Sequence, residues 1–356
     1  MFNISLLLSA AVIIICVLAN KLSNKIGMPV LIAFIALGMV FGSDGILKIP
    51  FENYSFAEQI CSVALVFIMF YGGFGTKLSE AKPVAVKALL LSSVGVIFTA
   101  ALTTVFCFFV LKIKLLESML IGAVMSSTDA ASVFSVLRSK NLNLKYNTAS
   151  MLEMESGSND PFAYMLTVIV LSFMKGENSV GQMVYSIAAQ IGFGVLIGFL
   201  IALGAVWFMK HFTFNTSGFD AAFVLGVAVL AYALPTLVGG NGYLSAYIVG
   251  IVLGNQNIHN KKSLVHFFDG MTGLMQMLIF FLLGLLSFPS KILTVLLPSI
   301  FIALFITFVA RPLAVATVLA PFKTKISQYL VVSWAGLRGA ASIVFAIMAM
   351  VGGVTM

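Results

Sequence analysis

Charged residues are scarce in this chain. Only 9% of its 356 residues are Asp, Glu, Lys or Arg, and 61% are hydrophobic, whereas soluble domains contain about 25% charged residues. There are three cysteines and three histidines. The cysteines fall inside apolar segments without a paired spacing, which argues against a disulfide framework or a zinc site. This composition excludes an ordinary soluble domain and indicates an integral membrane protein.

Long apolar runs recur from one end of the chain to the other. Each covers a bilayer core of about 30 Å as a helix, and none shows the alternating polarity of a barrel strand. The first run lacks a basic n-region and a cleavage site, so we interpret it as a retained span and not as a signal peptide. We therefore predict an all-α polytopic membrane protein without a soluble domain in this chain. Twelve spans are predicted, at residues 3–20, 28–45, 55–75, 84–111, 115–138, 147–174, 182–209, 219–237, 243–257, 268–287, 292–320 and 327–351.

The net charge of +8 does not indicate nucleic-acid binding, because the basic residues are sorted by connection. Most of them lie where an odd-numbered span is followed by an even-numbered one. By the positive-inside rule these connections are cytoplasmic, which places the N-terminus outside the inner membrane. The residues of this larger group are Lys21, Lys25, Lys77, Lys82, Lys87, Arg138, Lys140, Lys145, Lys210, Lys261, Lys262, Lys323 and Lys325.

Few ionisable residues are left inside the predicted spans. A charge inside a membrane is costly unless it is paired or hydrated, so these residues mark candidate transport sites. Spans five and twelve are also interrupted near their middles by polar or Gly residues, a pattern typical of discontinuous helices around a transport site. The ionisable residues are Asp129, Glu153, Glu155, Asp160, Arg311 and Arg338.

The segment "MLEMESGSNDPFAYML" concentrates polar residues in the sixth span. On a helix Ser156 and Asp160 share one face, and Pro161 frees the Gly157 carbonyl and predicts a kink. With Asn159, these oxygens suit a hard cation such as Na⁺ or K⁺. A desolvated carboxylate also holds a proton more readily, so Asp160 is expected to bind one or the other.

The remaining acids of this region are assigned separately. A second acid nearby, such as Asp129, strengthens proton binding at the Asp160 carboxylate. Glu155 lies on a neighbouring face of the same helix, and its buried charge needs a partner. Arg311 is the best candidate. Glu153 is expected near the cytoplasmic mouth.

The motifs "STDAASVFSVL" and "LEMESGSNDPFA", supported by "IPFENYSFAEQ" and "GLRGA", resemble the first family of monovalent cation:proton antiporters. These are bacterial sodium/proton and potassium/proton exchangers, and "ESGSNDP" with "IPFENY" is most similar to the potassium/proton branch linked to cell volume regulation. The resemblance implies homodimers of thirteen-helix protomers with a mobile core, two crossed broken helices and a dimerisation part. The chain ends after the twelfth span, so the last helix is expected to be missing.

The resemblance also implies roles for individual residues and an electroneutral exchange of one cation for one proton. Asp160 matches the cation- and proton-carrying acid, Asn159 its neighbour, and Asp129 the second acid on the broken helix. Ser156 and Thr128 match oxygen ligands of the monovalent cation. Glu155 and Arg311 match a structural ion pair, and Arg338 matches the arginine at the break of the twelfth span.

Several alternatives stay open. Sodium could replace potassium as the substrate, and hydroxyls such as Ser126, Thr128, Ser132 and Ser158 could simply join helices. A cation channel would need a ring of carbonyls or charges, and no filter-like segment is visible. An Asp129–Asp160 dyad could serve an intramembrane protease, but the ligands beside Asp160 argue against it. We expect a transporter of K⁺ or Na⁺ and protons, with no enzymatic activity and no cofactor.

Overall fold

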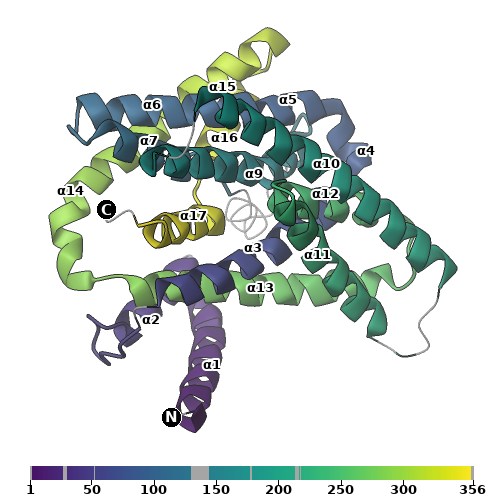
Figure 1. The fold of residues 1–356 in the computed structure, drawn as a ribbon, viewed down its shortest axis with the longest axis horizontal. Helices are drawn as coiled ribbons and strands as arrows, with labels where there is room; N and C mark the ends of the chain where they lie inside the picture. The colour runs from purple at the N-terminus through teal and green to yellow at the C-terminus, as the bar shows by residue number, and fades with distance from the viewer. Residues whose placement is uncertain are drawn as a thin grey trace.

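The computed structural model describes residues 2–26, 30–51, 53–129, 144–176, 179–212, 216 and 218–353 (Figure 1). The described part of the chain is helical and contains no β-strand, which confirms the predicted all-α fold. The helices are α1 (Phe2–Ile26), α2 (Val30–Phe41), α3 (Tyr54–Gly75), α4 (Leu78–Ala81), α5 (Ala85–Leu90), α6 (Val96–Phe109), α7 (Leu115–Val124), α9 (Thr148–Met174), α10 (Val180–His211), α11 (Phe219–Leu237), α12 (Gly242–Gly254), α13 (Lys261–Leu286), α14 (Pro289–Phe305), α15 (Arg311–Leu319), α16 (Ile326–Trp334) and α17 (Ala340–Val351).

Within the described residues, six helical stretches are long and apolar enough to cross a membrane. Helix α9 is not among them, because its polar residues lower its mean hydropathy. Shorter apolar helices accompany the six, and two of these, α7 and α17, are the helices that end or begin at the predicted interruptions. The six stretches are Tyr54–Gly75, Leu78–Phe109, Gly181–His211, Phe219–Leu237, Lys261–Leu286 and Pro289–Phe322.

The helices form two groups. Helices α1, α2, α3, α11, α12 and α13 pack mainly with one another, and we call them the scaffold group. Helices α4 to α7, α9 and α14 to α17 form the second group, which we call the carrier group because it contains Asp160. Helix α10 connects α9 to α11 and packs on α12. Helix α17 packs mostly on α3 and α13, and we count it with the carrier group because the break that precedes it is hydrogen-bonded to Asp129. Figure 1 shows α3 and α13 running side by side, opposite α7 and α9.

Close glycine contacts hold the scaffold group together, and they occur twice in one pattern. A Cβ added at Gly73 of α3 would meet the Tyr247 carbonyl of α12, and one at Gly250 of α12 would meet the Phe70 carbonyl of α3. In the same way, a Cβ added at Gly284 of α13 would meet the Ile35 carbonyl of α2, and one added at Gly38 of α2 would meet the Phe281 carbonyl of α13. Small residues allow such close backbone approach in membrane helices. The α3–α12 and α2–α13 pairs are therefore corresponding units.

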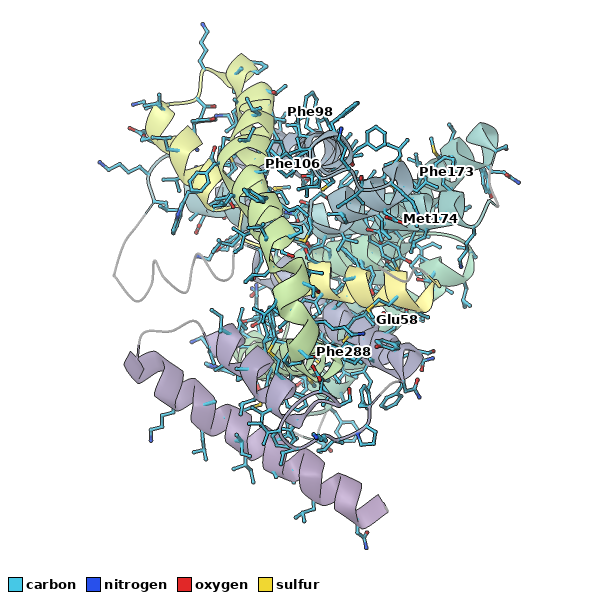
Figure 2. All side chains as sticks on the ribbon, turned by 90° about the vertical axis from the view of Figure 1, so that its left-hand side faces the viewer. Glu58, Phe98, Phe106, Phe173, Met174 and Phe288 are labelled. Atoms are coloured by element: carbon cyan, nitrogen blue, oxygen red, sulfur yellow. The ribbon has the colours of Figure 1, made fainter. Side chains whose placement is uncertain are left out.

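Aromatic stacking and apolar exposure mark the outer part of the carrier group. Phe106 of α6 stacks on Phe305 of α14 with ring centroids 4.1 Å apart, and Figure 2 shows Phe106 beside the α14 ribbon. No residue of α14 is fully buried, and Phe98 of α6 is 41% exposed. These apolar surfaces suit contact with lipid.

Several predicted boundaries differ from the observed helices. The helix at the span predicted for 268–287 begins earlier, at Lys261. Its first turns carry polar as well as apolar residues, so they were not included in a span predicted from apolar runs. The span predicted at 84–111 belongs to a helical stretch that begins at Leu78 and includes a 3₁₀ turn (Lys82–Val84) and a π-helical turn (Leu91–Gly95). Helix α9 continues through Pro161 as one α-helix.

Candidate functional site

Two non-helical segments of the carrier group lie against each other. The first, Met125–Asp129, follows α7, and the second, Ala335–Gly339, separates α16 from α17. The Asp129 amide donates to the Leu337 carbonyl at 2.7 Å, and the Arg338 Nε donates to the Met125 carbonyl at 2.9 Å. Unpaired backbone groups are costly in a membrane interior, so these bonds stabilise both interruptions. The predicted break of span twelve is present; the continuation of span five beyond Asp129 lies outside the described residues.

A glycine allows the two segments to approach. A Cβ added at Gly339 would lie 2.8 Å from Cγ of Asp129 and 2.7 Å from its Oδ2. Any larger residue at this position would push the Asp129 carboxylate away. The "GLRGA" motif therefore has a steric role at the crossing as well as supplying Arg338.

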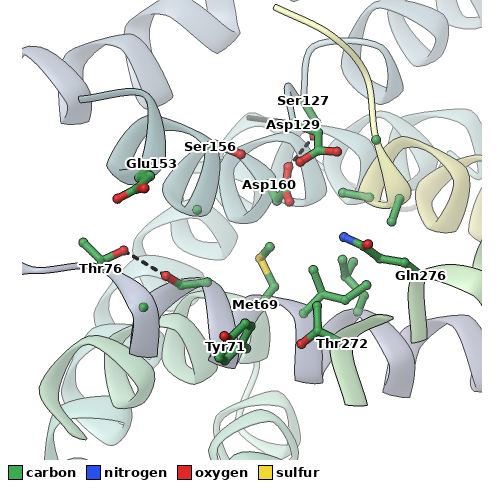
Figure 3. Close-up of a pocket in the computed structure, with 18 of the residues that line it drawn as sticks. Met69, Tyr71, Thr76, Ser127, Asp129, Glu153, Ser156, Asp160, Thr272 and Gln276 are labelled. Atoms are coloured by element: carbon green, nitrogen blue, oxygen red, sulfur yellow. Dashed lines mark hydrogen bonds between the residues drawn. The ribbon is translucent and has the colours of Figure 1, made fainter. Parts of the chain in front are cut away.

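Asp160 lies on α9 and is directly bound to the first non-helical segment. The Ser127 hydroxyl donates a hydrogen bond to the Asp160 Oδ1, and both side chains line one cavity (Figure 3). Ser127 is 1% exposed and Asp160 is 8% exposed. Ser127 was not among the predicted site residues, because helical periodicity does not relate it to Asp129. In the structure this segment is not helical, and both Ser127 and Asp129 line the cavity.

Thr128 points the other way in that segment. The Asn159 amide Nδ2 donates to both the Thr128 carbonyl, at 3.1 Å, and the Thr128 hydroxyl. The Ser156 hydroxyl donates to the same carbonyl at 3.1 Å. Thr128 and Asn159 are not among the cavity-lining residues, whereas Ser156 is. Three side chains of α9 thus hold the segment: Asp160 binds Ser127, and Ser156 and Asn159 bind Thr128.

The Glu155 carboxylate faces away from the cavity and lies beside Arg311. Arg311 Nη1 is 2.7 Å from Glu155 Oε1, with both side chains almost fully buried. Arg311 directly follows a π-helical turn, Ile306–Ala310, and its Nη2 donates to the Val332 carbonyl of α16 at 3.3 Å. Gly336 packs against the Arg311 stem, where an added Cβ would lie 2.8 Å from Cγ. The pair therefore connects α9 and α15 to the break between α16 and α17.

The cavity has a volume of about 690 Å³ and lies between the two helix groups. Four carboxylates line it, and no Lys, Arg or His occurs among the described residues that do so. Asp129, Glu153 and Asp160 come from the carrier group, and Asp269 comes from α13 of the scaffold group. Glu153 lies near Thr76, away from Asp160 (Figure 3). The site is therefore acidic and rich in oxygen atoms, and it extends from Asp160 to Thr76.

Beyond Asp160, the two groups are packed together by aromatic rings. Tyr164, one helical turn after Asp160 on α9, contacts Tyr243 of α12 with centroids 5.0 Å apart. Phe345 of α17 lies 5.8 Å from Tyr164 and 6.4 Å from Tyr243. None of these three rings lines the cavity. Tyr164 follows Asp160 along α9, on the side away from Glu153.

Comparison with known proteins gives a match along almost the whole chain. Residues 8–355 match the family model described as sodium/hydrogen exchanger, transmembrane. The chain is 36% identical over 358 residues to a protein from Shewanella sp. (strain ANA-3) named K(+)/H(+) antiporter NhaP2. It is 34% identical over 356 residues to K(+)/H(+) antiporter NhaP from Alkalimonas amylolytica. Each alignment covers 99% of this chain and 61% of the relative, so the chain spans about three fifths of their length.

The fold is also similar to a solved structure. The sodium proton antiporter MjNhaP1 from Methanocaldococcus jannaschii at pH 8 superposes with a TM-score of 0.88 at 24% sequence identity. The match covers 99% of this chain and 89% of the other. At this identity the likeness establishes a shared fold.

Proposed function

The chain belongs to the sodium/hydrogen exchanger family, and from this premise we propose that it is a secondary antiporter exchanging a monovalent cation for a proton. The curated relatives named K(+)/H(+) antiporters support K⁺ as the first candidate. A 24% identical relative from Methanocaldococcus jannaschii, named "Probable Na(+)/H(+) antiporter 2", supports Na⁺ as the alternative. The observation that carries the proposal is the buried Asp160 carboxylate beside the Ser127 hydroxyl at the edge of an acidic cavity.

In this proposal Asp160 carries either the cation or the proton. The Asp160 carboxylate and the Ser127 and Ser156 hydroxyls supply hard oxygen ligands from the cavity wall, and Asp129 adds negative charge. Oxygen ligands without thiolate or imidazole suit K⁺ or Na⁺. A cation and a proton each neutralise the same carboxylate, so binding of one displaces the other. This competition makes the exchange one for one.

Thr128 and Asn159 have an indirect role in this account. Both were predicted to be near the cation, but their side chains bind each other behind the lining surface. We assign them to fixing the non-helical segment Met125–Asp129, which presents Ser127 and Asp129 to the cavity. Arg338 supports the same segment through the Met125 carbonyl, and Glu155 with Arg311 stabilises the adjoining helices.

Alternating access requires movement between the two helix groups. The cavity between them supports a mechanism in which the carrier group slides along the scaffold group and takes Asp160 from one side of the membrane to the other. The basic residues assign the Thr76 and Glu153 end of the cavity to the cytoplasmic side. The contacts of Tyr164 with Tyr243 and Phe345 are then placed beyond Asp160, toward the outer side. An inner-membrane homodimer with its N-terminus outside completes the proposal.

The test is a pH-gradient dequenching assay in proteoliposomes with K⁺, Na⁺ and Li⁺ over several pH values. Asp160→Asn keeps the size of the side chain but removes the exchangeable charge, so cation-dependent proton flux is expected to disappear. Glu153→Gln, at the other end of the cavity, is the matched control and is expected to retain exchange. Cation flux uncoupled from protons would instead support a channel, and exchange by Asp160→Asn would reject Asp160 as the carrier.

A further inference from the structure

Two short linkers join the scaffold group to the carrier group. Thr76–Lys77 connects α3 to α4, and Ser287–Phe288 connects α13 to α14. All four residues have extended backbone conformations, with ψ between 92° and 153°. The linkers lie at opposite ends of the paired helices α3 and α13 (Figure 1). Sliding of the carrier group must be accommodated at these two linkers and along the longer connection through α10.

Asn255 binds the first linker from both sides. It follows the last residue of α12, and its Nδ2 donates to the Thr76 carbonyl at 2.8 Å. Its Oδ1 accepts the Leu78 amide, also at 2.8 Å. One amide side chain thus spans Lys77 and fixes the backbone on either side. The contact comes from a scaffold helix that is distant in sequence.

Asp44 binds next to the second linker in a comparable way. It lies shortly after α2, and its Oδ2 accepts the Ser290 amide in the first turn of α14 at 2.7 Å. Asp44 lies outside the membrane-spanning helices, and the Ser290 hydrogen bonds hold the pKa of its carboxyl below the usual value of 3.8. A lowered pKa means that the contact weakens only in acid, as pH falls through that lowered pKa. The contact is therefore unaffected by pH in the neutral range.

The two arrangements correspond beyond these side chains. The Thr76 amide donates to the Gly73 carbonyl at 3.1 Å, and the Ser287 amide donates to the Gly284 carbonyl at 3.2 Å. Gly73 and Gly284 are also the glycines that meet α12 and α2. Helices α12 and α2, which pack on the helices before the linkers, are the ones followed by Asn255 and Asp44. The contacts thus repeat at equivalent places in the two corresponding helix pairs.

We propose that Asn255 and Asp44 are a matched pair of positioning residues that fix the two pivots about which the carrier group moves. The inference rests on the proposed antiport. Fixed linkers confine the displacement to one path, so losing either contact slows the change of access. Neither residue lines the cavity that holds Asp160, so cation affinity is unaffected.

The experiment compares Asn255→Ala and Asp44→Ala with two kinds of control. Asp44→Asn keeps an oxygen that accepts the Ser290 amide, and Gln256→Ala removes a neighbouring amide that binds Lys210 and not the linker. Since one net hydrogen bond corresponds to about a fivefold change in rate, Asp44→Ala, which loses one, is expected to lower the maximal antiport rate about fivefold. Asn255→Ala, which loses two bonds to the linker, is expected to lower it by at least as much. The half-saturating cation concentration is expected to stay within about twofold of wild type, and the two controls are expected to retain the wild-type rate.

A second readout does not depend on transport. Gln276, which lines the cavity from α13, is changed to Cys, and its labelling by a water-soluble maleimide is followed. The three native cysteines are buried. Altered pivots change the time that the cavity is open, so the labelling rate is expected to change by about threefold or more in both Ala variants, on the same hydrogen-bond scale.

The outcomes separate this inference from the proposed function. Wild-type maximal rates and wild-type labelling in both Ala variants would overturn the pivot assignment. A rate loss accompanied by a lower melting temperature, or by a changed half-saturating cation concentration, would overturn it too. If wild-type protein shows no antiport, the proposed function fails, and the labelling rates still decide the pivots. Where Asn255→Ala does not fold, Asn255→Asp replaces it, because it keeps the acceptor for Leu78 but loses the donor to Thr76.

Discussion

The Ser127 hydroxyl and the Asp160 carboxylate form a hydrogen bond between the non-helical segment after α7 and the middle of α9. The bond favours the charged carboxylate and presents two oxygen-bearing groups to one cavity. Asp160 is therefore held in place by a residue that also faces the cavity.

Ser127→Ala is predicted to weaken cation binding. The variant lacks one candidate ligand and one hydrogen bond to the charged carboxylate, so the half-saturating cation concentration should rise about tenfold, with the larger effect at acidic pH, where protons compete more strongly. Antiport rates over a range of cation concentrations provide the measurement. Ser127→Thr keeps the hydroxyl and should stay close to wild type.

Ser158→Ala is the matched control for this prediction. Ser158 is a buried serine like Ser127, and it lies on the same helix as Asp160. Its hydroxyl donates to the Met154 carbonyl of that helix and does not line the cavity. If both alanine variants raised the half-saturating concentration equally, the effect would be structural and the assigned role of Ser127 would be wrong.

Removing either partner of the Glu155–Arg311 pair is predicted to destabilise the fold. Glu155→Ala or Arg311→Ala leaves one buried charge without its partner, at a cost of about 3–5 kcal/mol. Melting temperatures of the solubilised protein and expressed amounts provide the measurement. The double variant leaves neither charge and should recover part of the loss; two single variants as stable as wild type would contradict the pairing.

Gly339→Ala is predicted to impair exchange by displacing the Asp129 carboxylate. The added methyl group would lie 2.8 Å from Asp129 Cγ, so either the carboxylate or the break must move, at a cost of about 1–3 kcal/mol. Cation-dependent proton flux per folded protein is the readout. Gly226→Ala, where an added Cβ meets nothing within 4 Å, should behave like wild type, and equal behaviour of the two variants would argue against the steric role.

The ionisable residues of the site could be predicted because so few lie in apolar spans. With only Arg311 and Arg338 available inside the spans, a buried Glu155 had few possible partners, and Arg311 lies beside it. The all-helical fold followed from the same long apolar runs. Composition and spacing were thus sufficient to predict the helices and the positions of the charged residues.

Other features depend on where a helix stops and on contacts between distant segments. Ser127 faces Asp160 only because α7 ends at Val124 and the residues that follow are not helical. If that stretch were helical, Ser127 and Asp129 would lie on different faces of the helix. The binding of Asn255 to the Thr76–Lys77 linker joins segments whose pairing no local pattern specifies.

The most direct test of the account measures the half-saturating cation concentration of the wild-type antiporter as a function of pH. If one cation and one proton compete for Asp160, this concentration should rise as pH falls, approaching about tenfold per pH unit at the acidic end because each unit raises the proton concentration tenfold. The maximal rate at saturating cation should change much less. A half-saturating concentration that does not vary with pH would contradict competition at Asp160.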